Sequence, residues 1–428
     1  MSLVANSIQL DPSKKYRLKR AVEILPLDSA SAEPSFVVTT PEGRSFVVSE
    51  RLKQIAQLFD GEHSLHDIAE ILSEQHGAPV SHDQVQEIMS RYLQPNGLIE
   101  DAAAPPAPPQ AAARKGKLPL DFVFRFPLIS PRAAAPVVSR LTWLFQLPIA
   151  VAAIAAIFVT HVAFYQQWFA TRPKISFVAS EVIIFYLLAL GTAVFHEFGH
   201  AAACRAYRCD HGAIGVCLYL IFPAFYVNLS RSWRLPGRQR AVIDLGGIYF
   251  QLLSTVPLFL YFLLTGSRYA CATIYSVDLM VLFSLNPVLK FDGYWLLVDL
   301  SGVVNLQRRG FRVVKETVLW SLGLAREIPV LRQIAGRGRK LLLVTYSLIS
   351  ITFFASVILL LVTVFPAQVT RLAHASAELT RSLGKGAGET LVSMGRLLGS
   401  LIFFLFIYRL LSQTVFRLFQ RRAKRGTS

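Results

Sequence analysis

The sequence predicts an α-helical polytopic membrane protein with a small α+β, winged-helix-like soluble domain at its N-terminus. Hydrophobic residues make up 53% of the chain and charged residues only 17%, whereas soluble domains usually carry about 25% charged residues. Residues 1–100 hold 9 Lys/Arg against 14 Asp/Glu, although the whole chain has a formal net charge of +17. The acidic front end argues against a nucleic-acid partner, and the excess of basic residues lies between and after apolar runs, as in membrane proteins.

The first 100 residues show the periodicities of a β-hairpin followed by three helices. Two runs rich in Phe, Val and Thr, 36–39 and 45–48, flank a Pro-Glu-Gly turn at 41–43. Apolar residues then recur at helical spacing in three stretches, near 50–59, 64–75 and 82–93. Ser64 with Asp67 three residues later is typical of a helix N-terminus. We therefore expect a compact domain over 1–100.

An Ala/Pro-rich segment at 101–117 predicts an extended linker, so the membrane domain should cover 118–428. About six apolar runs approach the roughly 20 residues that cross a bilayer. They lie near 139–161, 177–203, 241–264, 273–298, 340–365 and 391–414. A further apolar stretch, 212–229, contains Gly215 and Pro223, and we expect it to be re-entrant or to lie at the membrane surface.

Lysine and arginine in the loops predict the orientation of these spans. They are frequent in 204–240, in 299–340 and in the C-terminal tail, and sparse in the loops on the opposite side. The positive-inside rule therefore predicts a multi-pass protein of the plasma (inner) membrane with both termini in the cytoplasm.

The second predicted span ends in a group of ionisable residues, His196-Glu197-Phe-Gly-His200. Residues four apart lie on one face of a helix, so His196 and His200 can direct both imidazoles at one metal ion. Glu197 is placed to take a proton from water and pass it to a leaving amine. Two packing histidines with an ion-paired glutamate are the alternative, but ionisable groups at the end of an apolar span are costly unless they face a cavity or a metal.

A third ligand is offered by the fourth predicted span, Asn286-Pro287-Val-Leu-Lys-Phe-Asp292-Gly293. Pro287 removes a backbone donor and breaks the helix, and Gly293 permits an unusual backbone angle. The distorted segment could bring Asp292 to the metal, whereas a kink capped by Asp292 is the alternative. Catalytic zinc usually has three protein ligands and one open position, which Asp292 would complete.

With HExxH in one span and Asn-Pro before Asp-Gly in a later one, residues 120–300 resemble the site-2 protease family of intramembrane zinc metalloproteases, in its peptide zinc metalloprotease branch. The resemblance implies Zn²⁺ held by His196, His200 and Asp292, with Glu197 as acid and base and Asn286 in substrate binding. It implies a zinc metalloendopeptidase that hydrolyses a peptide bond of a membrane-associated or precursor peptide near the cytoplasmic side.

Two departures from that family's pattern concern substrate handling. Asp244-Leu-Gly-Gly247 stands in the place of a third-span motif that contains Pro or Asn, and Lys290 precedes the third ligand by two residues. A non-catalytic membrane scaffold for peptide maturation or export, or a signalling protease that releases a membrane-tethered regulator, are alternative functions. Cys204 as a fourth ligand and a second metal site at 209–211 are further possibilities, against a buried thiol and a polar turn.

About 65 residues of the N-terminal domain resemble pyrroloquinoline-quinone biosynthesis protein D. Phe59-Asp-Gly61 before the second helix and Asn96-Gly-Leu-Ile99 at the end carry this resemblance. Relatives of that domain hold leader peptides of ribosomally made natural products. The resemblance implies a leader peptide as partner, together with an export adaptor or transporter, and a regulatory or dimerising module is the alternative.

Overall fold

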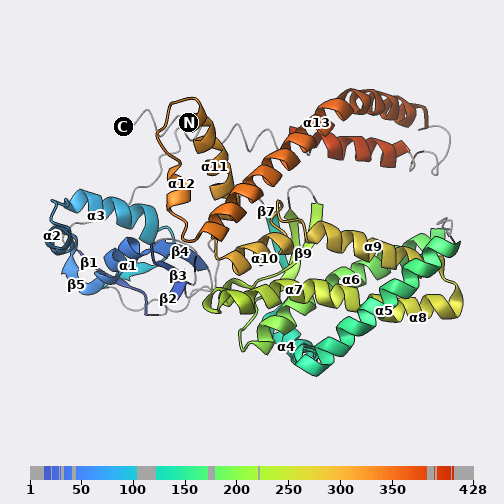
Figure 1. Cartoon of the computed structure of the whole chain (residues 1–428), viewed down its shortest axis with the longest axis horizontal. Helices are drawn as coiled ribbons and strands as arrows, with labels where there is room; N and C mark the ends of the chain where they lie inside the picture. The colour runs from blue at the N-terminus through green and yellow to red at the C-terminus, as the bar shows by residue number, and fades with distance from the viewer. Residues whose placement is uncertain are drawn as a thin grey trace.

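The computed structural model describes residues 14–20, 22–27, 29, 33–40, 45–103, 122–171, 179–219, 222–382, 390, 393–405 and 407–408. Most of these residues are helical. Figure 1 shows the N-terminal elements at one end of the molecule and the long apolar helices toward the other. Most of the predicted linker, 101–117, lies outside the described residues.

Two small antiparallel sheets and three helices form the N-terminal unit, residues 15–101. One sheet has the strand order β5-β1-β6 and the other β2-β3-β4. The elements are β1 (Lys15–Leu18), β2 (Glu23–Leu27), β3 (Ser35–Thr39), β4 (Ser45–Ser49), α1 (Glu50–Gln57), β5 (Asp60–Ser64), α2 (Leu65–His76), α3 (His82–Ile88) with a π-helical turn (Met89–Leu93), and β6 (Ile99–Asp101). The predicted strand pair is confirmed, because β3 and β4 pair from Ser35–Ser49 to Thr39–Ser45, and the predicted turn at 41–43 lies outside the described residues. The three predicted helices are also present.

The apolar stripes of these helices form the core of the N-terminal unit. Ile68, Val85 and Met89 are fully buried there. Ser64 begins α2 with a capping box: its hydroxyl accepts from the Asp67 N–H at 3.3 Å, and its own N–H donates to the Asp67 carboxylate at 2.8 Å. The Ser64 hydroxyl also donates to the Asp67 carboxylate at 2.8 Å, and the two hydrogen bonds that this carboxylate accepts from Ser64 lower the pKa of Asp67 below its usual value.

The remaining elements begin with a strand and are then mainly helical. They are β7 (Phe122–Ile129), α4 (Pro131–Leu141), the 3-10 helix η2 (Thr142–Phe145), α5 (Leu147–Thr171), α6 (Ala179–Ala206), β8 (Ile214–Tyr219), β9 (Phe222–Val227), the 3-10 helix η3 (Ser230–Arg234), α7 (Gly237–Leu253), α8 (Thr255–Thr265), α9 (Arg268–Ser284), α10 (Asp292–Ser301), α11 (Leu306–Ser321), α12 (Pro329–Arg332) and α13 (Arg337–Ser382).

Four helical segments in the described part of the chain are long and apolar enough to cross a bilayer. They are Leu147–Ala170, Ser180–Ala206, Gly237–Thr265 and Arg337–Ser382. The prediction of about six spans is therefore not confirmed. The run at 273–298 is divided between α9 and α10, and of the run at 391–414 the structure describes a shorter apolar helix, Ser393–Leu405.

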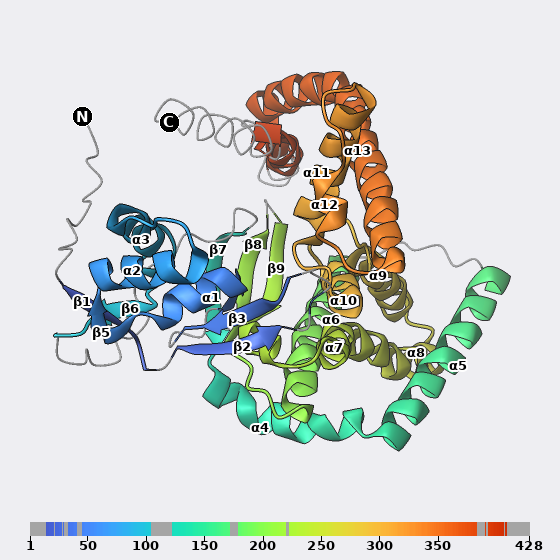
Figure 2. The ribbon, with the colours of Figure 1, turned by 60° about the vertical axis from the view of Figure 1, so that its left-hand side comes forward.

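The apolar stretch at 212–229 forms a β-hairpin. Its strands β8 and β9 pair from Ile214–Val227 to Tyr219–Phe222, and β7 adds to the outer side of β8. Figure 2 shows this sheet between the N-terminal unit and the helices α6 and α7. The hairpin thus places β9 against α6, where the histidines lie.

The backbones of α6 and α7 are in close contact beside the two candidate histidines. A Cβ atom added to Gly199 of α6 would lie only 2.2 Å from the carbonyl oxygen of Gly246 in α7. Only glycine permits this approach at Gly199. Helix α7 therefore runs directly beside the His196–His200 segment.

The N-terminal unit contacts the helical part through η3. The Ser45 hydroxyl donates a hydrogen bond to the carbonyl oxygen of Ser230 at 2.9 Å. Arg234 forms an ion pair with Glu23 of β2 at 3.2 Å. The sheet β2-β3-β4 therefore rests on the short segment that follows β9.

Candidate metal centre

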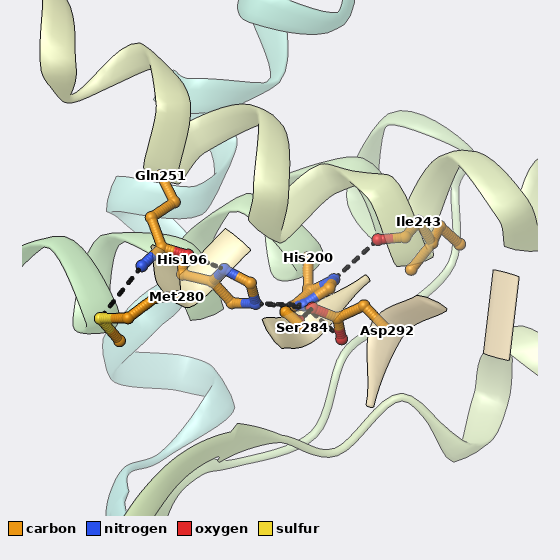
Figure 3. A network of polar contacts seen from close by, with 7 residues as sticks. All are labelled: His196, His200, Ile243, Gln251, Met280, Ser284 and Asp292. Atoms are coloured by element: carbon orange, nitrogen blue, oxygen red, sulfur yellow. Dashed lines mark hydrogen bonds and ion pairs between the residues drawn. The ribbon is translucent and has the colours of Figure 1, made fainter. Parts of the chain in front are cut away.

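Three predicted ligands meet at one point. His196 and His200 lie one turn apart on α6, and Asp292 is the first residue of α10. The two Nε2 atoms are 3.0 Å apart, and the Asp292 carboxylate oxygens lie 3.0 Å from the Nε2 of His196 and 3.4 Å from that of His200. Figure 3 shows the two rings and the carboxylate pointing toward one another.

Two acceptors on α7 orient the imidazoles of both histidines through their Nδ1 atoms. His200 Nδ1 lies 2.7 Å from the carbonyl oxygen of Ile243, and His196 Nδ1 lies 2.9 Å from Oε1 of Gln251. These oxygens can only accept, so each Nδ1 carries the proton and, in a neutral ring, each Nε2 keeps its lone pair. Such outer hydrogen bonds are what fixes the tautomer of metal-ligating histidines.

Gly247 keeps the space between the two rings open. A Cβ atom at this position would lie 2.4 Å from His200 Nε2 and 2.5 Å from His196 Nε2. Two nitrogen lone pairs and a carboxylate that face one another at such distances repel unless a cation or a proton lies between them. Two imidazoles and one carboxylate are a donor set of catalytic zinc, so the residues present fit this metal.

An interruption between helices α9 and α10 brings Asp292 close to the two histidines. Helix α9 ends at Ser284 and α10 begins at Asp292, as the Pro287 and Gly293 pattern predicts. A Cβ atom at Gly293 would lie 2.1 Å from the carbonyl oxygen of Leu285, so the two segments cross in close contact. The Ser284 hydroxyl donates to Asp292 Oδ2 at 2.7 Å and fixes the carboxylate.

The centre opens into a large cavity of about 1850 Å³. Glu197 lines it together with the three candidate ligands and is only 8% exposed. Val227 of β9 lines the same cavity. Within the described part of the chain, Asn286 does not line this cavity, and its side-chain oxygen accepts from the Val288 N–H at 2.8 Å.

Sequence reasoning missed the supporting residues. Gln251 is a polar residue within an apolar run, and this contrast was the available signal. The roles of Gly247 and of the Ile243 carbonyl depend on how α7 packs, which no local pattern reports. Among the described residues, the group of His, Cys, Asp and Glu side chains close enough to share a metal is His196, His200 and Asp292, so the segment 209–211 supplies no second group. Cys204 is a buried thiol outside that group.

A curated protein shares part of this sequence. The Bacillus subtilis (strain 168) protein named "Putative peptide zinc metalloprotease protein YydH" is 27% identical over 121 residues, which cover 27% of this chain and 46% of that protein. The chain spans about half the length of the curated relative that it matches. No family model matches the chain, and no solved structure matches it.

Proposed function

We propose that this protein is an intramembrane zinc metalloprotease that hydrolyses a peptide bond of a membrane-associated or precursor peptide near the cytoplasmic side. The observation that carries the proposal is the meeting of His196, His200 and Asp292 beside Glu197 in one cavity. The four helices of the described segments that are apolar and long enough to cross a bilayer support a membrane setting. The printed name of the relative from Bacillus subtilis points to the same class of enzyme.

His196, His200 and Asp292 would hold the zinc ion, with Gln251 and Ile243 keeping the rings in the required tautomer. Bound zinc supplies Lewis-acid chemistry, which polarises a carbonyl and makes water more acidic. Glu197 would accept a proton from water at a carboxylate oxygen and deliver it to the nitrogen of the departing amine. The Glu197 carboxylate lies in the cavity wall, where β9 packs against α6.

The walls of the cavity favour an extended, partly apolar peptide. Strand β9 pairs with β8 on one side, and within the described residues no strand pairs with its other edge. Residues of β9 line the cavity, so an extended peptide could lie beside the strand and Glu197. Helix α13 also contributes apolar side chains to the lining at helical spacing, Phe353, Val357, Leu361 and Phe365. A helical substrate would have to unwind first, because its amides are hydrogen-bonded internally.

The N-terminal domain, 1–100, precedes the membrane domain, 118–428, and the segment 101–117 links the two. We propose that the N-terminal domain lies in the cytoplasm and recruits a leader peptide, in company with an export adaptor or transporter. Support comes from η3, because Ser230 both lines the cavity and accepts the hydrogen bond from Ser45. Deletion of 1–100 should reduce processing, and unchanged processing would count against recruitment.

Protease activity can be tested without a known substrate. Cells that produce the wild type or Glu197→Gln are compared by mass spectrometry of membrane-associated and secreted peptides. Glu181→Gln is the matched control, because Glu181 lies in the first turn of the same helix and pairs with Arg268 at 3.6 Å. We expect one or more uncleaved peptides to accumulate only with Glu197→Gln. The same peptide profile for the wild type and Glu197→Gln would contradict the proposed function.

A further inference from the structure

One face of α7 carries the residues that support the metal centre. Ile243, Gly247 and Gln251 recur at four-residue spacing, so they lie along one side of the helix. Ile243 and Gln251 hold the two histidines, and Gly247 leaves space between the rings. Arg240 precedes Ile243 by three residues and continues this face by one turn. Its side chain contacts α10 instead of a histidine.

Arg240 forms a buried ion pair with Asp299 of α10. Its Nε donates to Asp299 Oδ1 at 2.8 Å, and the two side chains are 3% and 6% exposed. Its Nη1 donates to the carbonyl oxygen of Leu235 at 2.8 Å, and the guanidinium lies 5.0 Å from the centre of the Trp233 ring. Several fixed partners hold the planar guanidinium in one orientation, which a flexible ammonium group would not reproduce.

This ion pair acts on the helix that begins with the third ligand. Asp299 lies two turns after Asp292 in α10. The backbones of α7 and α10 also meet here, because a Cβ atom at Gly237 would lie 2.5 Å from the Asp299 carbonyl oxygen. Helix α10 is short and is separated from α9 by a non-helical segment, so it needs such a contact to fix its position along α7. A displacement of α10 would carry Asp292 away from the histidines.

We propose that Arg240 is a positioning residue, whose ion pair with Asp299 sets the location of α10 and thereby the distance from Asp292 to His196 and His200. Helix α7 then positions all three ligands, two by direct hydrogen bonds and the third through α10. This inference rests on the proposed function, because that function assigns Asp292 as a zinc ligand. A buried ion pair contributes little net stability, so geometry is the better explanation for its presence.

The test must separate a loss of positioning from a loss of folding. Arg240→Gln does not separate them, because it leaves Asp299 buried without its cation, which is strongly destabilising in general. The double variant Arg240→Met with Asp299→Leu removes both charges and avoids this penalty. Arg240→Lys keeps the charge and loses the planar geometry. Arg312→Gln is the matched control, because Arg312 pairs with Glu316 at 3.0 Å on α11, away from the three ligands.

The experiment uses the full-length protein purified in detergent. Zinc affinity is measured by competition with a chromophoric chelator, and the cobalt-substituted protein is examined by visible absorption. We expect the double variant to stay folded, to lose about 10- to 100-fold in zinc affinity, as outer-shell changes do, and to show an altered cobalt spectrum. Arg240→Lys should lie between the double variant and the wild type, and Arg312→Gln should match the wild type.

Two results would contradict these ideas in different ways. Wild-type zinc affinity and an unchanged cobalt spectrum in the folded double variant would overturn the positioning role alone. A folded wild type that binds neither zinc nor cobalt would overturn the proposed function, and the positioning role with it.

Discussion

The N-terminal unit and the metal centre are stabilised by opposite kinds of contact. In the N-terminal unit, helices bury large apolar side chains such as Ile68 and Met89, and these fill the core. Around the metal centre, glycines let backbones approach, and polar groups on α7 orient the ligands. Removing atoms should therefore harm the first region, whereas adding atoms should harm the second.

The largest effect is expected from adding one methyl group at Gly247. The Cβ atom of Gly247→Ala would lie within 2.5 Å of both Nε2 atoms, so the metal position would be blocked. We expect zinc to be lost from the purified protein, as measured by elemental mass spectrometry. Gly191→Ala, on α6, is the control, because a Cβ atom there has no neighbour within 4 Å. Normal zinc content in Gly247→Ala would break the comparison.

The second-largest effect is expected from removing a buried apolar side chain from the core of the N-terminal unit. Ile68→Ala should reduce the stability of the N-terminal unit by about 2–5 kcal/mol, because a fully buried isoleucine leaves a cavity. Hydrogen exchange of the amides in α2 and α3 measures this loss in the full-length protein. Zinc content should not change. Leu25→Ala, at a position that is 36% exposed, should have a much smaller effect on exchange.

The sequence predicted local features of both regions and missed the contacts between distant segments. The four-residue spacing of His196 and His200 and the helix break before Asp292 follow from local geometry, and both are present. Hydropathy alone does not separate buried strands from a re-entrant segment, so the hairpin at 214–227 was not expected. The same measure does not detect where a helix stops, which is why the run at 273–298 was counted as one span.

Removal of an orienting side chain should have an intermediate effect at the metal centre. Gln251→Ala deletes the acceptor of His196 Nδ1, and outer-shell changes of this kind typically cost 10- to 100-fold in metal affinity. Zinc affinity measured by chelator competition checks this. Arg238→Ala, at an exposed position on another face of α7, should leave the affinity unchanged. Equal affinities for the two variants would show that α7 does not orient His196.

The smallest effect is expected at the start of α2. Ser64→Ala removes the capping hydroxyl and should cost about 1 kcal/mol of local stability. The hydrogen bonds from Ser64 lower the pKa of Asp67 in the folded state. The stability that the ionised Asp67 carboxylate contributes is therefore present above its unfolded pKa and is lost as the pH falls through its folded pKa. Hydrogen exchange should therefore show a difference between wild type and Ser64→Ala near neutral pH that shrinks in acid below about pH 4. A difference that grew in acid would contradict this account of the cap.

The most direct test of the central claim is the zinc content of three purified proteins: the wild type, Asp292→Ala and Glu197→Gln. If His196, His200 and Asp292 hold zinc and Glu197 only transfers protons, the wild type and Glu197→Gln will contain near-stoichiometric zinc and Asp292→Ala will have lost it. A folded wild type without zinc, or full zinc in Asp292→Ala, would contradict the account.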